Sequence, residues 1–143
     1  MKQFVEDSVE VRVRFSESDA MGVIWHGNYL KFFEDGREKL GEHFGMSYLD
    51  ISKAGYVVPI VNVEVKYLAP VTFGQKIKVI CHLVDAKAAK IIHEYEIWNL
   101  ATNQISCKGR TEQVFLNQDT KSLQLNYPEF YEKWKKNLPW KQK

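Results

Sequence analysis

Apolar and charged residues alternate along residues 9–15, where valine or phenylalanine occupies each odd position and glutamate or arginine each even one. This two-residue period predicts a half-buried β-strand. From Tyr29 to about Phe44, large apolar residues instead recur at helical spacing, which predicts an amphipathic helix. Gly36 lies in the middle of the apolar face, so we expect the helix to approach a sheet closely at that point.

The ends of this helix carry their own signals. Asn28 precedes it and predicts a side-chain cap, in which the amide oxygen accepts early backbone N–H groups. Gly45 predicts the end of the helix. Ser47 then predicts the start of a short second helix, which continues to Ala54 and stops at Gly55.

The rest of the chain predicts strands joined by short turns. The expected strands are residues 57–67, 76–84, 91–98 and 104–116, and a helical tail is expected over residues 127–140. Connections of hairpin length imply antiparallel pairing. One long helix and one such sheet bury their apolar faces on each other. The sequence therefore predicts a single α+β domain over residues 1–143, with an antiparallel five-stranded sheet wrapped around one long central helix.

Composition and charge narrow the classes of function. The chain has 143 residues, 45% of them hydrophobic and 27% charged, which is typical of one globular domain. A net charge of +2 without an arginine-rich run argues against a nucleic-acid partner. No apolar run reaches the roughly 20 residues that cross a bilayer, so we expect no membrane partner and a cytoplasmic location. Cys81 and Cys107 are expected to be buried, reduced thiols.

The segment between the first strand and the long helix carries the candidate chemistry. It contains an acid, Asp19, a glycine turn at Gly22, an aromatic residue, Trp25, and His26 just before the helix. A carboxylate beside the free amides of a helix start can activate an attacking group while the amides polarise a carbonyl. The segment is therefore predicted to be a site rather than a simple connection.

The residues of this segment resemble a known family. The run Asp19-Ala-Met-Gly-Val-Ile-Trp-His-Gly-Asn-Tyr29, followed by Phe32, Phe33 and Glu34, is similar to the signature of hotdog-fold acyl-CoA thioesterases, in the 4-hydroxybenzoyl-CoA thioesterase-like branch. Residues 61–70 resemble the second strand and turn of that family. The similarity in element order covers about residues 5–117 and leaves the C-terminal tail outside.

The resemblance implies roles for particular residues. Asp19 matches the catalytic carboxylate, and the amide of His26 or a neighbour matches the one that polarises the thioester carbonyl. The His26 side chain is a second catalytic candidate. The positions expected at the acyl-CoA substrate are Trp25, Gly27, Asn28, Tyr29, Val58, Pro59, Ile60 and Val61. The resemblance also implies a homodimer or homotetramer with its sites at the dimer interface, and no cofactor, because coenzyme A belongs to the substrate.

Other residues give weaker candidates. Glu34 is the reserve catalytic acid, since a glutamate on the central helix is catalytic in another hotdog branch, although a structural or solvated role suits it as well. Glu17 is expected to support local structure. Ser16 and Ser18 lack the glycine-flanked elbow of a serine hydrolase. The four histidines show no spacing typical of metal ligands.

Three functions follow from these residues. The first is hydrolysis of an acyl-CoA thioester to a free acid and coenzyme A, with Asp19 acting either as nucleophile or as general base. The second is hydrolysis of acyl groups carried on acyl carrier protein. The third is a hotdog module that binds acyl-CoA or a protein without turning it over.

Overall fold

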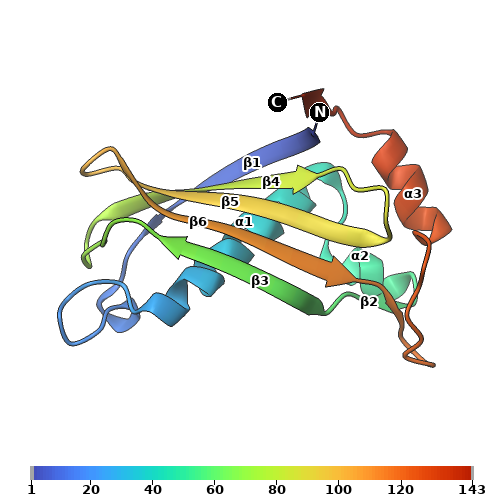
Figure 1. Cartoon of the computed structure of the whole chain (residues 1–143), viewed down its shortest axis with the longest axis horizontal. Helices are drawn as coiled ribbons and strands as arrows, with labels where there is room; N and C mark the ends of the chain where they lie inside the picture. The colour runs from blue at the N-terminus through green and yellow to red at the C-terminus, as the bar shows by residue number, and fades with distance from the viewer. Residues whose placement is uncertain (1, 143) are drawn as a thin grey trace.

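The computed structural model describes residues 2–142. Its main sheet is antiparallel and has six strands in the order β3-β6-β5-β4-β1-β8. The strands are β1 (Gln3–Arg12), β3 (Ile60–Tyr67), β4 (Lys76–Val84), β5 (Lys90–Asn99), β6 (Gln104–Val114) and β8 (Lys141–Gln142). The long helix α1 (Tyr29–Phe44) crosses one face of this sheet (Figure 1). The predicted α+β class is confirmed, although β8 makes the sheet one strand larger than the five predicted.

Two predicted strands have different bounds in the structure. β1 ends at Arg12, and Phe15 instead begins the short 3-10 helix η1 (Phe15–Glu17), because pairing with β4 stops at Arg12 opposite Lys76. The run predicted over residues 57–67 is divided into β2 (Tyr56–Val57) and β3. β2 pairs with β7 (Leu116–Asn117) in a separate small sheet. Pro59 lies between the two strands and has no N–H to continue a ladder.

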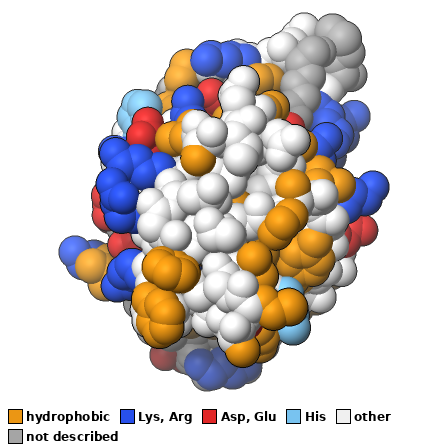
Figure 2. All heavy atoms as spheres, turned by 90° about the vertical axis from the view of Figure 1, so that its left-hand side faces the viewer, with side chains coloured by type: hydrophobic (Ala, Val, Ile, Leu, Met, Phe, Trp, Pro, Cys, Tyr) orange, Lys and Arg blue, Asp and Glu red, His pale blue; other side chains and the backbone are white. Residues whose placement is uncertain are grey.

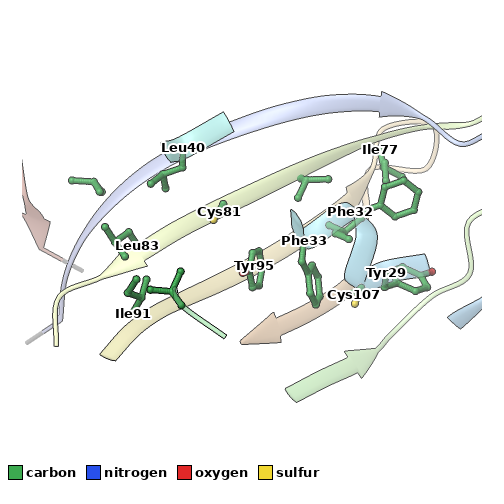
Figure 3. Close-up of a cluster of buried hydrophobic side chains, with 14 of the residues drawn as sticks. Tyr29, Phe32, Phe33, Leu40, Ile77, Cys81, Leu83, Ile91, Tyr95 and Cys107 are labelled. Carbon is green, nitrogen blue, oxygen red and sulfur yellow. The ribbon is translucent and has the colours of Figure 1, made fainter. Parts of the chain in front are cut away.

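The core lies between α1 and the concave face of the sheet. Phe32 and Phe33 are fully buried there, and the Phe33 ring stacks on Tyr95 with 4.3 Å between ring centroids (Figure 3). The predicted close approach at Gly36 is confirmed. A Cβ at this position would lie 3.0 Å from Val79 Cγ1, which is tighter than ordinary contact, so the helix can rest on β4 only with a glycine there.

The helix ends agree with the sequence in part. Gly45 ends α1 in the left-handed region with φ +78°, as predicted. Ser47 caps α2 (Tyr48–Lys53) through a capping box with Asp50, also as predicted. The predicted side-chain cap at Asn28 is wrong, because its amide nitrogen donates to the Glu17 carbonyl oxygen at 2.9 Å. The tail helix α3 is shorter than predicted and spans Glu129–Lys136.

Both cysteines are free and buried, as predicted for reduced thiols. Burial raises the pKa of the Cys107 thiol to about 12 and raises that of Cys81 further. Neither thiol is therefore prepared to act as a nucleophile. Among residues 2–142, no helix is long and apolar enough to cross a membrane.

The fold places different segments at the two ends of the sheet. The segment that holds Asp19 lies at the left of Figure 1, beyond the end of β3, whereas α2 and α3 lie at the right. A hydrogen bond from Tyr67 Oη to the His26 carbonyl oxygen, 2.9 Å long, ties the last residue of β3 to the first segment. The opposite end of β3, at Ile60, points toward α2 and β2 (Figure 1).

Candidate active site

The segment that holds Asp19 folds back on itself as a small hairpin. Ser18 and Ile24 form an antiparallel bridge, and the Asp19 amide donates to the Val23 carbonyl oxygen at 2.8 Å. Gly22 closes the turn with φ +82°, a conformation that side chains rarely adopt. The arms of this hairpin therefore hold Asp19 on one side and the approach to His26 on the other.

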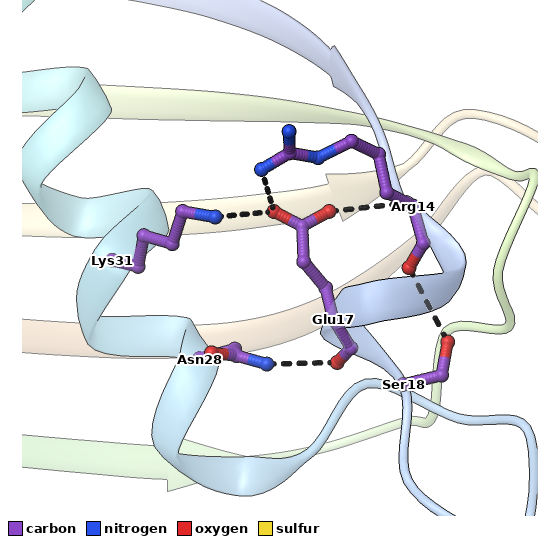
Figure 4. A network of polar contacts seen from close by, with 5 residues as sticks. All are labelled: Arg14, Glu17, Ser18, Asn28 and Lys31. Atoms are coloured by element: carbon purple, nitrogen blue, oxygen red, sulfur yellow. Dashed lines mark hydrogen bonds and ion pairs between the residues drawn. The ribbon is translucent and has the colours of Figure 1, made fainter.

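Glu17 anchors this hairpin to the rest of the protein. Its side chain is nearly fully buried and accepts hydrogen bonds from Lys31 Nζ at 2.8 Å and from the Arg14 amide at 2.7 Å (Figure 4). Its carbonyl oxygen accepts from the Trp25 amide and from Asn28 Nδ2. Burial opposes ionisation, but the bonds from Lys31 and Arg14 outweigh it and lower the pKa of the carboxyl. Glu17 thus has the structural role expected of it.

Removing the charge of Glu17 is expected to destabilise the protein. Glu17→Gln should lower the free energy of unfolding by about 2 kcal/mol at neutral pH, because Lys31 and Arg14 lose an ionised partner in a buried site. The lowered pKa fixes the sign. The stabilisation is complete above the ordinary carboxyl pKa of 4.5 and is lost as the pH falls through the lower folded value.

Urea unfolding at a series of pH values measures this difference. The exposed Glu129, which pairs with Lys133, provides the matched control, and Glu129→Gln is expected to leave stability nearly unchanged. A Glu17→Gln protein as stable as the wild type at neutral pH would contradict the anchoring role.

The Asp19 carboxylate is held by one oxygen only. Oδ1 accepts a hydrogen bond from the Met21 amide at 2.8 Å, whereas Oδ2 has no hydrogen bond to any residue in 2–142. The side chain is half-buried rather than enclosed. Asp19 therefore serves the local turn with one oxygen while the other remains able to meet a substrate or a water molecule.

Two backbone amides at the start of the helical segment are also free. Before α1 comes the short 3-10 helix η2 (His26–Asn28). The amides of Trp25 and Asn28 donate to backbone carbonyl oxygens, but those of His26 and Gly27 have no partner within the described chain. N–H groups at the start of a long helix favour a negative charge in front of them. These two amides can therefore stabilise an oxyanion.

Gly27 is required by the space around it. The Trp25 ring lies over its backbone so closely that a Cβ would collide with the ring. The Trp25 side chain itself is 49% exposed, and its ring lies 4.9 Å from that of His26 between centroids. Figure 2 shows several exposed hydrophobic side chains on this face, with lysine and arginine near its margins. Large hydrophobic residues exposed in this segment and the neighbouring turn are Phe15, Met21, Trp25 and Phe73.

The structure separates the other candidate residues. Tyr29 belongs to the core, since its side chain is buried and its hydroxyl lies 3.3 Å from Ser106 Oγ. Glu34 is largely exposed on α1, where its carboxylate lies 3.8 Å from Arg37 Nη2. Within one chain, the predicted substrate positions 58–61 are not beside Asp19. They lie at the start of β3, and a strand of eight residues spans roughly 25 Å.

Sequence reasoning missed a second polar group inside the fold. Arg37 and His93 are buried and line a cavity of about 670 Å³ between α1, α2 and the sheet. Arg37 occurs on the apolar stripe of the predicted helix, between Phe33 and Leu40, and this position could have identified it. Among the described residues, no group of three histidine, cysteine or acidic side chains could hold a metal ion.

Comparison with known proteins agrees with this geometry. The family model of the Thioesterase-like superfamily matches residues 13–140. The chain is 32% identical to the "Putative acyl-CoA thioesterase YneP" of Bacillus subtilis (strain 168), over 89% of this chain and 96% of the relative. It is 25% identical to the acyl-acyl carrier protein thioesterase ATL3 of Arabidopsis thaliana, over 87% of this chain but only 65% of the relative.

A solved structure supports the same assignment. The DHNA-CoA thioesterase from Staphylococcus aureus superposes with a TM-score of 0.81 and 29% identity, over 92% of this chain and 89% of that one. The match to the family model, which extends over most of the chain, includes Asp19 and both free amides. The chain therefore belongs to the Thioesterase-like superfamily, as its resemblance to the hotdog acyl-CoA thioesterases predicted.

Proposed function

We propose that the protein hydrolyses acyl-CoA thioesters to a free acid and coenzyme A, with Asp19 as the catalytic carboxylate. One observation carries this proposal. The same hairpin and helix start present a carboxylate oxygen without a partner and two adjacent amides without acceptors. Hydrolysis of a thioester requires both, since its carbonyl carbon must be attacked while the carbonyl oxygen becomes negative.

The chemistry follows from these groups. The thioester oxygen receives hydrogen bonds from the amides of His26 and Gly27. Asp19 either removes a proton from the attacking water or attacks the carbonyl carbon itself, forming an anhydride that water then opens. In both routes the C–S bond breaks and coenzyme A departs. The proposed reaction uses water and groups of the protein, without a cofactor.

The proposal includes a homodimer, because one chain supplies only part of the site. β3 is an end strand of the sheet, and its outer edge carries exposed apolar side chains, among them Val61, 57% exposed, and Val63, 39% exposed. Symmetric antiparallel pairing of two β3 strands would place Tyr67 of each chain near Ile60 of the other. Positions 58–61 of one protomer would then lie beside His26 and Asp19 of its partner.

Thiol release from short, long and aromatic acyl-CoAs tests this function. Wild-type protein is expected to turn over at least one class. The same acyl groups on acyl carrier protein test the principal rival, which the similarity to ATL3 supports. Faster hydrolysis of the carrier-bound form would favour that rival, and binding without any thiol release would favour a non-catalytic module.

A further inference from the structure

The cavity beside α1 has the size of a small-molecule site. Its volume is about 670 Å³, within the range of roughly 300–1,000 Å³ found for ligand pockets. It lies near the α2 end of β3, and Val58 on the way into that strand is one of its walls. Most of the lining is apolar, including Leu40, Met46, Ile51, Leu83 and Ile91.

Two polar side chains in this apolar lining have nitrogen atoms without partners. Arg37 is 6% exposed and His93 is 7% exposed. Arg37 Nε and His93 Nδ1 are both buried and form no hydrogen bond within the described chain. A buried polar atom left without a partner costs free energy, so such atoms are rare in folded proteins. Two of them lining one cavity indicate that a ligand supplies the missing partner.

The guanidinium group of Arg37 is held firmly by its other nitrogens. Nη1 donates to Tyr95 Oη at 3.0 Å, and Tyr95 Oη lies 2.7 Å from Thr111 Oγ1. Nη2 is 3.8 Å from the Glu34 carboxylate at the edge of the cavity. Because both ends of the group are placed, Nε–H is a fixed donor that no protein atom uses.

His93 complements this donor. It lies beside Tyr95, with 6.1 Å between ring centroids, so it shares a neighbour with Arg37. Burial and the nearby charge of Arg37 lower the pKa of His93 to about 3, and the ring is therefore neutral at neutral pH. A neutral imidazole has one nitrogen that accepts a hydrogen bond. A hydroxyl group matches both residues, since it accepts from Arg37 and donates to His93.

We propose that Arg37 and His93 select acyl groups that carry a hydroxyl at the end far from the thioester. The inference rests on the proposed function, in which the cavity of one protomer continues the site of its partner. Three glutamates, Glu34, Glu38 and Glu42, line the cavity as well. Their negative charge disfavours an acyl group that ends in a carboxylate and leaves the neutral hydroxyl as the preferred end.

Matched pairs of substrates test this selection. Each plain acyl-CoA is compared with counterparts that carry a hydroxyl or a carboxylate at the far end. For the length that fits, kcat/KM is expected to be at least about tenfold higher for the hydroxylated member, because the plain member leaves both nitrogens without partners. His93→Leu and, separately, Arg37→Met should reduce this ratio toward one.

The control is His82→Leu, a histidine on β4 outside the cavity that pairs with Glu6, and this variant is expected to keep the ratio. Melting temperatures show whether each variant remains folded. Calorimetric binding of the same pairs to Asp19→Asn reports the preference without turnover, so it separates this inference from the hydrolase proposal. Equal treatment of plain and hydroxylated members, a preference for the carboxylate, or a ratio unchanged in both cavity variants would overturn the inference.

Discussion

Replacement of Asp19 by asparagine is expected to lower kcat/KM for acyl-CoA hydrolysis at least about 100-fold, which corresponds to about 2.7 kcal/mol of transition-state stabilisation. Asparagine keeps the shape of the side chain and an oxygen that can accept the Met21 amide, so the turn should persist. It loses the negative charge that either removes a proton from water or attacks the thioester. Thiol release from the best acyl-CoA, measured for both proteins side by side, gives the ratio.

Two controls make this result specific. Asp119→Asn changes an exposed acid in the turn that follows β7, and it is expected to leave kcat/KM unchanged. A thermal melt of Asp19→Asn should match that of the wild type, which distinguishes lost chemistry from lost folding. Wild-type rates in a folded Asp19→Asn protein would remove Asp19 from the mechanism and make Glu34 the next acid to replace.

Local signals in the sequence predicted local structure well. Gly45 and Ser47 act through their own backbone and the next few residues, so their roles as helix stop and helix cap could be predicted and are confirmed. Gly36 could be predicted because a missing side chain within an apolar stripe implies a close neighbour. In each case the determining contact depends on one residue and the pattern around it.

Predictions that depended on distant partners were wrong or missing. Asn28 is a good helix cap by its residue type, but its side chain is engaged by the Glu17 carbonyl oxygen. The end of β1 depends on its pairing with β4, which no local pattern reveals. His93 was considered only as a metal ligand, because its unpartnered nitrogen beside Arg37 becomes visible only when α1 lies over β5.

The candidate site itself shows the same division. The free oxygen of Asp19 and the free amides of His26 and Gly27 lie in one short segment, so the sequence could identify them together. Positions 58–61 lie at the other end of β3 from His26, and only the partner of a symmetric dimer could bring them close. The proposed site therefore depends on an edge that the isolated chain leaves open.

Introducing a charge on this edge is expected to separate the protomers and to reduce turnover. Val63 lies near the middle of β3, so symmetric pairing would bring the two copies of residue 63 close together. Val63→Lys places like charges opposite each other, and lysine on an edge strand opposes pairing. We expect light scattering to fall from twice the chain mass of 16.7 kDa to that mass, and thiol release per chain to fall at least about 100-fold.

The concentration dependence of the rate gives this experiment its sharpest outcome. If the partner completes the site, activity per chain of Val63→Lys should rise with protein concentration as dimers form again. Leu125→Lys is the matched control, since Leu125 is 81% exposed and lies outside the strands of the main sheet. This variant should keep both mass and rate. A monomeric Val63→Lys protein with full activity would show that each chain carries a complete site, and so would a wild-type enzyme that is active as a monomer.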